Sequence, residues 1–196
     1  MQNEINNANR LCSACGMCCD GTLFQSATVG LSDEALVAAT GLTINNNQGE
    51  LSFAQPCKFY CQSQCSIYLK RPPVCINYRC RLLKKLDRGE MELEAALAKV
   101  NMVRALQAGL ADILPDAGTK PVSAAEVLDV RASIDEADPS QRMQHAVFLM
   151  LSTKYIGLIR DDFWRRPKPA DVLEAAEAET QEKQQARIIL DSYKIQ

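Results

Sequence analysis

The sequence predicts a mainly α protein, in which an irregular, metal-stapled cysteine module with a short hairpin precedes a helical half of about four helices. Two observations lead to this prediction. All nine cysteines lie before residue 81, and the sequence after Gly89 is rich in Ala, Leu, Glu and Lys, with apolar residues at helical spacing. The change of composition divides the chain into a cysteine-cluster metal-binding module, 1–88, and a helical region, 89–196, that packs on the module or extends from it.

Short elements are expected in the first part. Residues 31–39 should form a helix with Ser32 as its N-cap, and Gly41 should end it. Residues 42–53 contain two apolar runs around an Asn- and Gly-rich centre, which predicts a hairpin. The remaining segments are expected to be loops with one short strand.

Four helices are expected after Gly89, separated by proline, glycine or capping residues. Apolar steps of three and four residues from Leu93 to Leu110 define one face of the first. Pro139 should occupy the first position of the third helix, with Asp138 as its cap. The expected helices cover residues 93–110, 123–134, 139–164 and 170–193.

The third helix is expected to supply core side chains rather than a ligand-binding stripe. Its lone histidine, His145, is distant in sequence from the cysteines and is expected to be a surface or packed residue. The expected core positions are Met143, Val147, Met150, Leu151, Tyr155, Leu158 and Ile159.

Charge and hydropathy exclude several classes of partner. The net charge is −2, whereas nucleic-acid-binding domains usually carry a basic excess, so nucleic acid is not expected as a partner. No apolar run approaches the ~20 residues that span a bilayer, and no export signal opens the chain, so we expect a cytoplasmic protein without a membrane partner. In a reducing cytosol, an odd number of cysteines indicates metal binding rather than a disulfide framework.

The first cysteines are spaced as metal ligands. Cys12, Cys15 and Cys18 are separated by two residues each, as in the first three ligands of a ferredoxin-type iron–sulfur run, and a CxxC pair also forms half of a zinc knuckle. This spacing leaves zinc and iron–sulfur, including [4Fe–4S], open. Neighbouring side chains diverge, so Cys18 and Cys19 should not both be terminal ligands of one tetrahedral ion; they could serve two sites or bridge two metals.

The later cysteines allow more than one arrangement. Cys57, Cys61 and Cys65 are each separated by three residues, which departs from the CxxxCxxC of radical S-adenosylmethionine enzymes, and Cys75 and Cys80 follow. Two four-cysteine sites with one spare thiol, or one cluster surrounded by further cysteines, both fit the count. Basic residues among these cysteines would offset the charge of a thiolate-bound metal; they are Lys58, Lys70, Arg71, Arg79, Arg81, Lys84, Lys85 and Arg88.

The cysteine segment resembles a known family. The segment from Cys12 to Cys19, the Pro56-Cys57-Lys58-Phe59 segment and the segment from Cys65 to Cys75 together resemble the CxxCxxCC cysteine-cluster family, described as zinc- or iron-chelating. The resemblance covers residues 10 to 85. It implies a metal-binding role for Cys12, Cys15, Cys18, Cys19, Cys57, Cys65 and Cys75. Cys80 is added as a ligand, whereas Cys61 lies outside the family pattern.

Two functions follow as hypotheses. The first is a cytoplasmic metal-binding protein that holds zinc or an iron–sulfur cluster through its cysteine thiolates. The second is an iron–sulfur-dependent enzyme or redox component with Cys61 or Cys80 as a redox-active thiol, because the family resemblance extends to flagellin lysine methylases. Those enzymes act with S-adenosylmethionine, but no Gly-rich strand-to-helix turn for such a ligand is present. In either case the helical half could present a surface to a protein partner or substrate.

Overall fold

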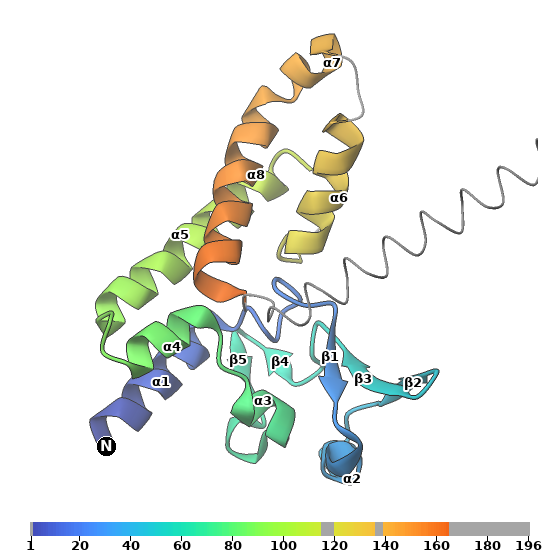
Figure 1. Ribbon diagram of the computed structural model, residues 1–196, viewed down its shortest axis with the longest axis vertical. Helices are drawn as coiled ribbons and strands as arrows, with labels where there is room; N and C mark the ends of the chain where they lie inside the picture. The colour runs from blue at the N-terminus through green and yellow to red at the C-terminus, as the bar shows by residue number, and fades with distance from the viewer. Residues whose placement is uncertain (1, 115–119, 136–138, 165–196) are drawn as a thin grey trace, which may run out of the picture. The chain divides into compact units, whose positions relative to one another are not determined.

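The computed structural model describes residues 2–114, 120–135 and 139–164 (Figure 1). Helices dominate this part of the chain and are accompanied by a small antiparallel sheet, which confirms the predicted mainly α class. The helix expected over residues 170–193 and the cap Asp138 lie outside the described residues. Among the described helices, none combines the length and the apolar character needed to cross a bilayer.

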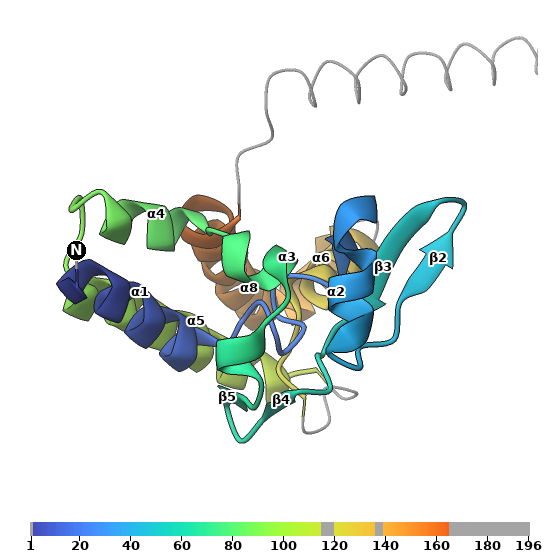
Figure 2. The ribbon, with the colours of Figure 1, turned by 90° about the horizontal axis from the view of Figure 1, so that it is seen from below.

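Five helices form the larger part of the fold (Figure 1). α5 lies against α8, α6 packs on α8, and α1 packs on both α4 and α5, as Figure 2 shows from below for α1 and α5. The helices expected over 93–110 and 123–134 are confirmed as α5 and α6. The five are α1 (Gln2–Cys15), α4 (Arg81–Asp87), α5 (Leu93–Ala111), α6 (Ala124–Asp135) and α8 (Ala146–Leu158).

These helices share one hydrophobic core, which we call the helical core. Leu11 and Met17 from the cysteine-rich part are buried in it together with Val103 of α5 and Tyr155 of α8. Burial of apolar surface stabilises the folded state by about 25 cal/mol for each Å² removed from water. The core therefore contains residues from both sides of the composition change at residue 88, and the division of the chain there stays a prediction.

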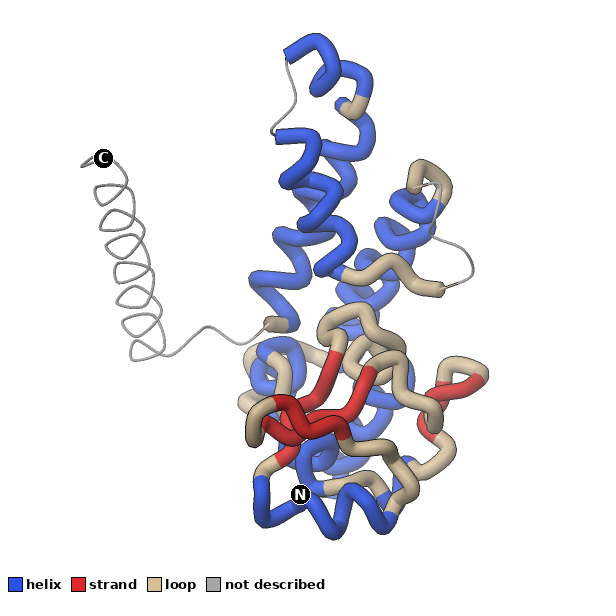
Figure 3. Tube along the Cα trace, turned by 90° about the vertical axis from the view of Figure 1, so that its right-hand side faces the viewer, coloured by secondary structure: helices blue, strands red, loops and turns tan. Residues whose placement is uncertain are grey.

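A second, smaller core lies beneath the three-stranded sheet. Strands β1 (Ser26–Val29), β2 (Asn45–Asn47) and β3 (Glu50–Ala54) are antiparallel in the order β1-β3-β2, with Val29 opposite Leu51 (Figure 3). Helix α2 (Glu34–Ala39) contributes a buried valine to this core. The buried members of this core, which we call the sheet core, are Val29, Val37, Leu42, Leu51 and Phe53.

The predicted hairpin and short helix are correct in kind but shifted in detail. The strands of the hairpin are β2 and β3, so the Asn residues expected in the turn are in a strand, and the turn is formed by Gln48 and Gly49 with φ of 52° and 93°. Positive φ at both positions is typical of a two-residue hairpin turn. Ser32 is not the N-cap, because a 3₁₀ turn over Leu31–Asp33 precedes α2. Gly41 does follow the end of the helix, with φ of 86°.

The predicted third helix is interrupted. Helix α7 (Pro139–Gln144) begins at Pro139 as expected, but exposed His145 separates it from α8, and a π-helical turn, Ile159–Phe163, follows. Three expected core positions are wrong, since Met143 is 77% exposed, Val147 58% and Met150 66%. The sequence of α8 is apolar on every side, so periodicity alone does not select the buried face.

A buried carboxylate joins the π-helical turn to α4 and α5. Its ionisation makes the free energy of unfolding depend on pH. Asp162 is 5% exposed and accepts hydrogen bonds from Lys85 Nζ at 2.8 Å and Lys99 Nζ at 2.6 Å. Burial raises the pKa of Asp162, but the two lysines outweigh burial and hold that pKa below its ordinary value. The carboxylate therefore stabilises the fold above the ordinary aspartate pKa of about 3.9, and this contribution is lost as pH falls through the folded-state value.

We expect Asp162→Asn to lower the free energy of unfolding at pH 7 by about 1–3 kcal/mol, the range for hydrogen bonds to charged groups. Urea unfolding of the variant and of the unmodified protein from pH 7 to pH 2 measures the difference in their free energies of unfolding. This difference should vanish at pH 2. Asp161→Asn is the matched control, because Asp161 is 60% exposed and should have a much smaller effect. A difference that stays constant down to pH 2 would contradict the assignment.

Candidate metal centre

Three of the first four cysteines are placed by the end of α1 and the turn that follows it. Cys12 and Cys15 are one helical turn apart on α1, and the N–H of Gly16 donates to the carbonyl oxygen of Cys12 at 3.2 Å. Gly16 has φ of 62°, a left-handed conformation that ends the helix. The chain then turns back, so that Cys18 packs against the helical core as Cys12 does.

Helix α1 is missing from the sequence-based prediction. Its Asn-rich sequence has low intrinsic helix propensity, and only the tertiary structure supplies the compensating contacts. Leu11, on the same helix as Cys12 and Cys15, is 2% exposed in the helical core. Burial of this face stabilises α1, and the helix in turn orients two thiols toward the neighbouring helices.

A fourth thiol joins these three from a distant part of the sequence. Cys80 is the N-cap of α4, and its Sγ accepts a hydrogen bond from the Leu83 N–H at 3.3 Å. α4 packs against α1, and Cys80 packs against the helical core. We call Cys12, Cys15, Cys18 and Cys80 the first cysteine set.

The other ligand candidates lie beside the sheet core. Strands β4 (Tyr60–Cys61) and β5 (Gln64–Cys65) form a hairpin in which Tyr60 pairs with Cys65, and helix α3 (Pro73–Asn77) carries Cys75. Cys57 and Cys75 pack against the sheet core. The N–H of Cys57 donates to the carbonyl oxygen of Cys19 at 2.7 Å. We call Cys19, Cys57, Cys65 and Cys75 the second cysteine set.

Each thiol of the first set lies in or against the helical core, and Cys15 is buried. The pKa of Cys12 is raised to about 11 and that of Cys15 to about 12, in both cases mainly by burial and in part by Cys80. Burial also raises the pKa of Cys18 well above the ordinary thiol value, with Cys15 and Cys80 adding to the rise. Negative charge on these sulfurs is unfavourable unless a cation is bound, because a metal ion makes thiolate the stable form of a coordinating cysteine.

The pKa values of thiols in the second set are also raised, mainly by burial and in part by other thiols of that set. Burial raises the pKa of Cys19 to about 12, and the next contributions come from Cys75, Cys65 and Cys57. Burial raises the pKa of Cys75 to about 11, and Cys57 and Cys65 add to it. Burial also raises the pKa of Cys57, although hydrogen bonds from the backbone N–H groups of Phe59 and Tyr60 oppose the rise. Backbone donors aimed at sulfur are suited to a thiolate ligand.

Residues 11–96 match the model of the family CxxCxxCC, described as "Putative zinc- or iron-chelating domain". We call these matched residues the CxxCxxCC domain. No curated protein and no solved structure matches the chain. The matched segment includes all nine cysteines and extends to Ala96, so the first turn of α5 belongs to the CxxCxxCC domain.

A buried polar network attaches the cysteine turn of the CxxCxxCC domain to α5. Arg104 Nη2 donates to the carbonyl oxygen of Cys15 and pairs with Asp20 Oδ2, both at 2.6 Å. Gln107 Nε2, one turn further along α5, donates to Thr22 Oγ1 at 2.9 Å. Sequence reasoning missed this network, because the polar residues of α5 resemble ordinary solvent-facing positions until the partner segment is known.

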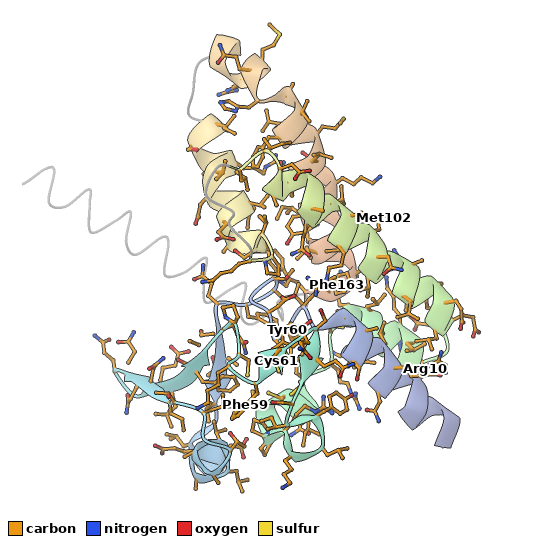
Figure 4. All side chains as sticks on the ribbon, turned by 180° about the vertical axis from the view of Figure 1, so that it is seen from behind. Arg10, Phe59, Tyr60, Cys61, Met102 and Phe163 are labelled. Carbon is orange, nitrogen blue, oxygen red and sulfur yellow. The ribbon has the colours of Figure 1, made fainter. Side chains whose placement is uncertain are left out.

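Two features of the structure oppose replacement of Gly16, the glycine of the CxxCxxCC motif. Its φ of 62° disfavours other residues, and a Cβ there would overlap the Tyr60 hydroxyl and lie 2.5 Å from Tyr60 Cζ. Tyr60 is in the hairpin that carries Cys65 of the second set, and Figure 4 labels it beside Phe59 and Cys61. Gly16 therefore permits close approach of the two cysteine-bearing segments.

We expect Gly16→Ala to lower the free energy of unfolding by about 2–4 kcal/mol, because the positive φ and the overlap with Tyr60 both oppose a side chain. Urea unfolding of the metal-bound protein measures this. Gly89→Ala is the matched control, since Gly89 also has positive φ, 67°, but open space around it. Tyr60→Ala should partly rescue Gly16→Ala, and equal destabilisation by both glycine variants would show that the overlap contributes nothing.

The donor chemistry of the CxxCxxCC domain fits zinc or an iron–sulfur cluster. Thiolates are soft ligands that select these metals over Mg²⁺ and Ca²⁺. In the described part of the chain, no three His, Cys, Asp or Glu side chains already have the arrangement of a metal site. Each cysteine set is therefore defined by the position of its residues, and coordination requires the thiols to rotate toward a common centre.

The structure separates one cysteine from the two sets. Cys61 is exposed at the tip of the β4–β5 hairpin (Figure 4), where Gln62 and Ser63 form the turn with φ of 48° and 61°. His145 is also exposed, at the N-cap of α8. All nine cysteines are free of disulfide bonds.

Proposed function

We propose that this is a cytoplasmic metal-binding protein in which the CxxCxxCC domain holds zinc or an iron–sulfur cluster through cysteine thiolates. Support comes from the match of residues 11–96 to a zinc- or iron-chelating family, together with the packing of Cys12, Cys15, Cys18 and Cys80 in or against the helical core and of Cys57 and Cys75 against the sheet core. The proposed ligands are Cys12, Cys15, Cys18, Cys19, Cys57, Cys65, Cys75 and Cys80.

The protein's own groups would prepare the metal site before the metal binds. α1 and α4 hold sulfurs in a packed core, and backbone N–H groups of Leu83 and Phe59 direct partial positive charge toward Cys80 and Cys57. A bound metal would supply the positive charge that keeps the buried thiols ionised. Removing such supporting groups typically weakens metal affinity by 10–100-fold.

A catalytic role receives less support. The resemblance to flagellin lysine methylases rests on the cysteine pattern of the sequence, and such a module can serve binding and structure without any reaction. Exposed Cys61 is the thiol accessible for redox chemistry, but exposure alone does not favour a reaction. We therefore propose metal binding without methyl transfer.

The test is anaerobic purification followed by elemental analysis, acid-labile sulfide determination and a visible spectrum on one sample. Stoichiometric zinc in colourless protein, or iron with sulfide and broad visible absorbance, would support the proposal and choose between the metals. Cys15→Ser should lower the metal content, whereas Cys61→Ser, an equally conservative change at an exposed thiol, should retain it. Protein that contains no metal and takes up neither zinc nor reconstituted cluster would contradict the proposal.

A further inference from the structure

Members of the two cysteine sets pack against different hydrophobic cores. All members of the first set, Cys12, Cys15, Cys18 and Cys80, belong to or pack against the helical core. In the second set, Cys57 and Cys75 pack against the sheet core, which shares no buried residue with the helical core. Packing therefore separates Cys57 and Cys75 from the first set.

The chain passes from one set to the other between Cys18 and Cys19. Cys18 contacts the helical core, whereas the carbonyl oxygen of Cys19 accepts a hydrogen bond from the N–H of Cys57 at 2.7 Å. The carbonyl oxygen of Cys57 in turn accepts a hydrogen bond from the N–H of Tyr60 at 2.9 Å, and Tyr60 pairs with Cys65 across the β4–β5 hairpin. The adjacent cysteines are thus connected to different segments, as expected if each serves a different site.

We propose that the thiols form two separate four-cysteine metal sites, one from Cys12, Cys15, Cys18 and Cys80 on the helical core and one from Cys19, Cys57, Cys65 and Cys75 beside the sheet core. This rests on the proposed metal-binding function and specifies how its ligands are divided. Four thiolates complete a closed tetrahedral zinc site or the ligand shell of an iron–sulfur cluster. Cys61 belongs to neither site.

One arginine is held beside the helix that carries Cys12. Arg71 lies four residues before Cys75; its Nε donates to the carbonyl oxygen of Tyr68 at 2.8 Å, and its guanidinium stacks 3.6 Å from the Tyr68 ring centroid. Tyr68 is held to α1 by a 3.0 Å hydrogen bond to Asn9. Two four-thiolate sites with divalent metals would each carry a formal charge of −2, so a fixed cation at this position would offset part of that charge.

The deciding experiment counts metal in variants with one cysteine removed from each set. Cys12→Ser and Cys75→Ser should each lose about half of the metal per chain, or each a different metal, and the double variant should lose all of it. Cys61→Ser is the matched control and should retain the full content. Far-ultraviolet circular dichroism on the same samples confirms that the helices remain folded.

Native mass spectrometry of the unmodified protein provides a second measurement that needs no variant to fold. Two metal centres per chain would support two sites, and one centre per chain would overturn the inference. Loss of all metal from both folded single variants would also overturn it, because a single shared site explains that result. Either of these results leaves the proposed metal-binding function intact, whereas metal-free protein that cannot be reconstituted would contradict the proposed function itself.

Discussion

Removing the bound metal should unfold the region around the sheet while most of α5, α6 and α8 stays helical. The sheet core has only five buried hydrophobic residues, against twenty-one in the helical core, so it depends more on the second cysteine set. Structural zinc supplies apparent binding free energies of about 10–16 kcal/mol in small domains that do not fold without it. A sheet core of this size cannot replace a contribution of that magnitude.

Hydrogen exchange before and after treatment with a strong chelator under reducing conditions measures this effect. Amides of β3, Glu50–Ala54, should lose protection, whereas those in the middle of α5 should keep most of theirs. Circular dichroism should retain most of its helical signal, and adding zinc or reconstituting the cluster should restore β3 protection. If α5 and β3 lose protection together, the two cores unfold as one unit and the expectation fails.

Arg104→Ala should strongly destabilise the fold, although Arg104 is not a hydrophobic core residue. The substitution removes the hydrogen bonds that Arg104 donates to the carbonyl oxygen of Cys15 and to the side chain of Gln107. It also removes the cation that pairs with the Asp20 carboxylate, which is 5% exposed. Losing one member of a buried pair costs about 3–5 kcal/mol, and because Arg104 is 30% exposed, we expect about 2–4 kcal/mol. The turn that carries Cys18 is attached through these contacts, so metal should also be released more readily.

Urea unfolding and the rate of metal transfer to a chelator measure the two effects. Arg104→Lys keeps the charge but not the planar donor geometry, and it should fall between the alanine variant and the unmodified protein. Arg88→Ala is the matched control, because Arg88 forms an exposed pair with Glu90 and should leave both measurements unchanged. An Arg104→Ala protein with normal stability and normal metal release would show that the network does not position the cysteine turn.

The cysteine-rich segment that matches a metal-chelating family and two later helices, α5 and α6, could be predicted from the sequence. The spacing of Cys12, Cys15 and Cys18 restricts the ligand type before any fold is known, because thiolates select a few metals. α5 and α6 were predicted because their apolar residues recur at helical spacing between clear breaks. The cysteine spacing and the apolar spacing of the helices are local properties, because each can be read within one segment of the sequence.

The features that failed depend on contacts between distant segments. α1 has weak intrinsic propensity and is helical because Leu11 packs against other helices, and β1 became a strand because β3 pairs with it. Exposed Met150 and buried Tyr155 on α8 could not be distinguished by hydrophobicity, since α5 and α6 select the buried face.

The sequence by itself determined that this chain carries closely spaced cysteine thiols before residue 81 and helices with regularly spaced apolar residues after them, because residue type and helical period can be read from neighbouring residues. Only the tertiary structure decided which thiols lie together. Cys80 joins Cys12 because α4 packs on α1, and Cys19 is connected to Cys57 through a backbone hydrogen bond between segments far apart in the chain. Such pairings depend on how hydrophobic faces pack, and spacing along a single chain does not encode that packing.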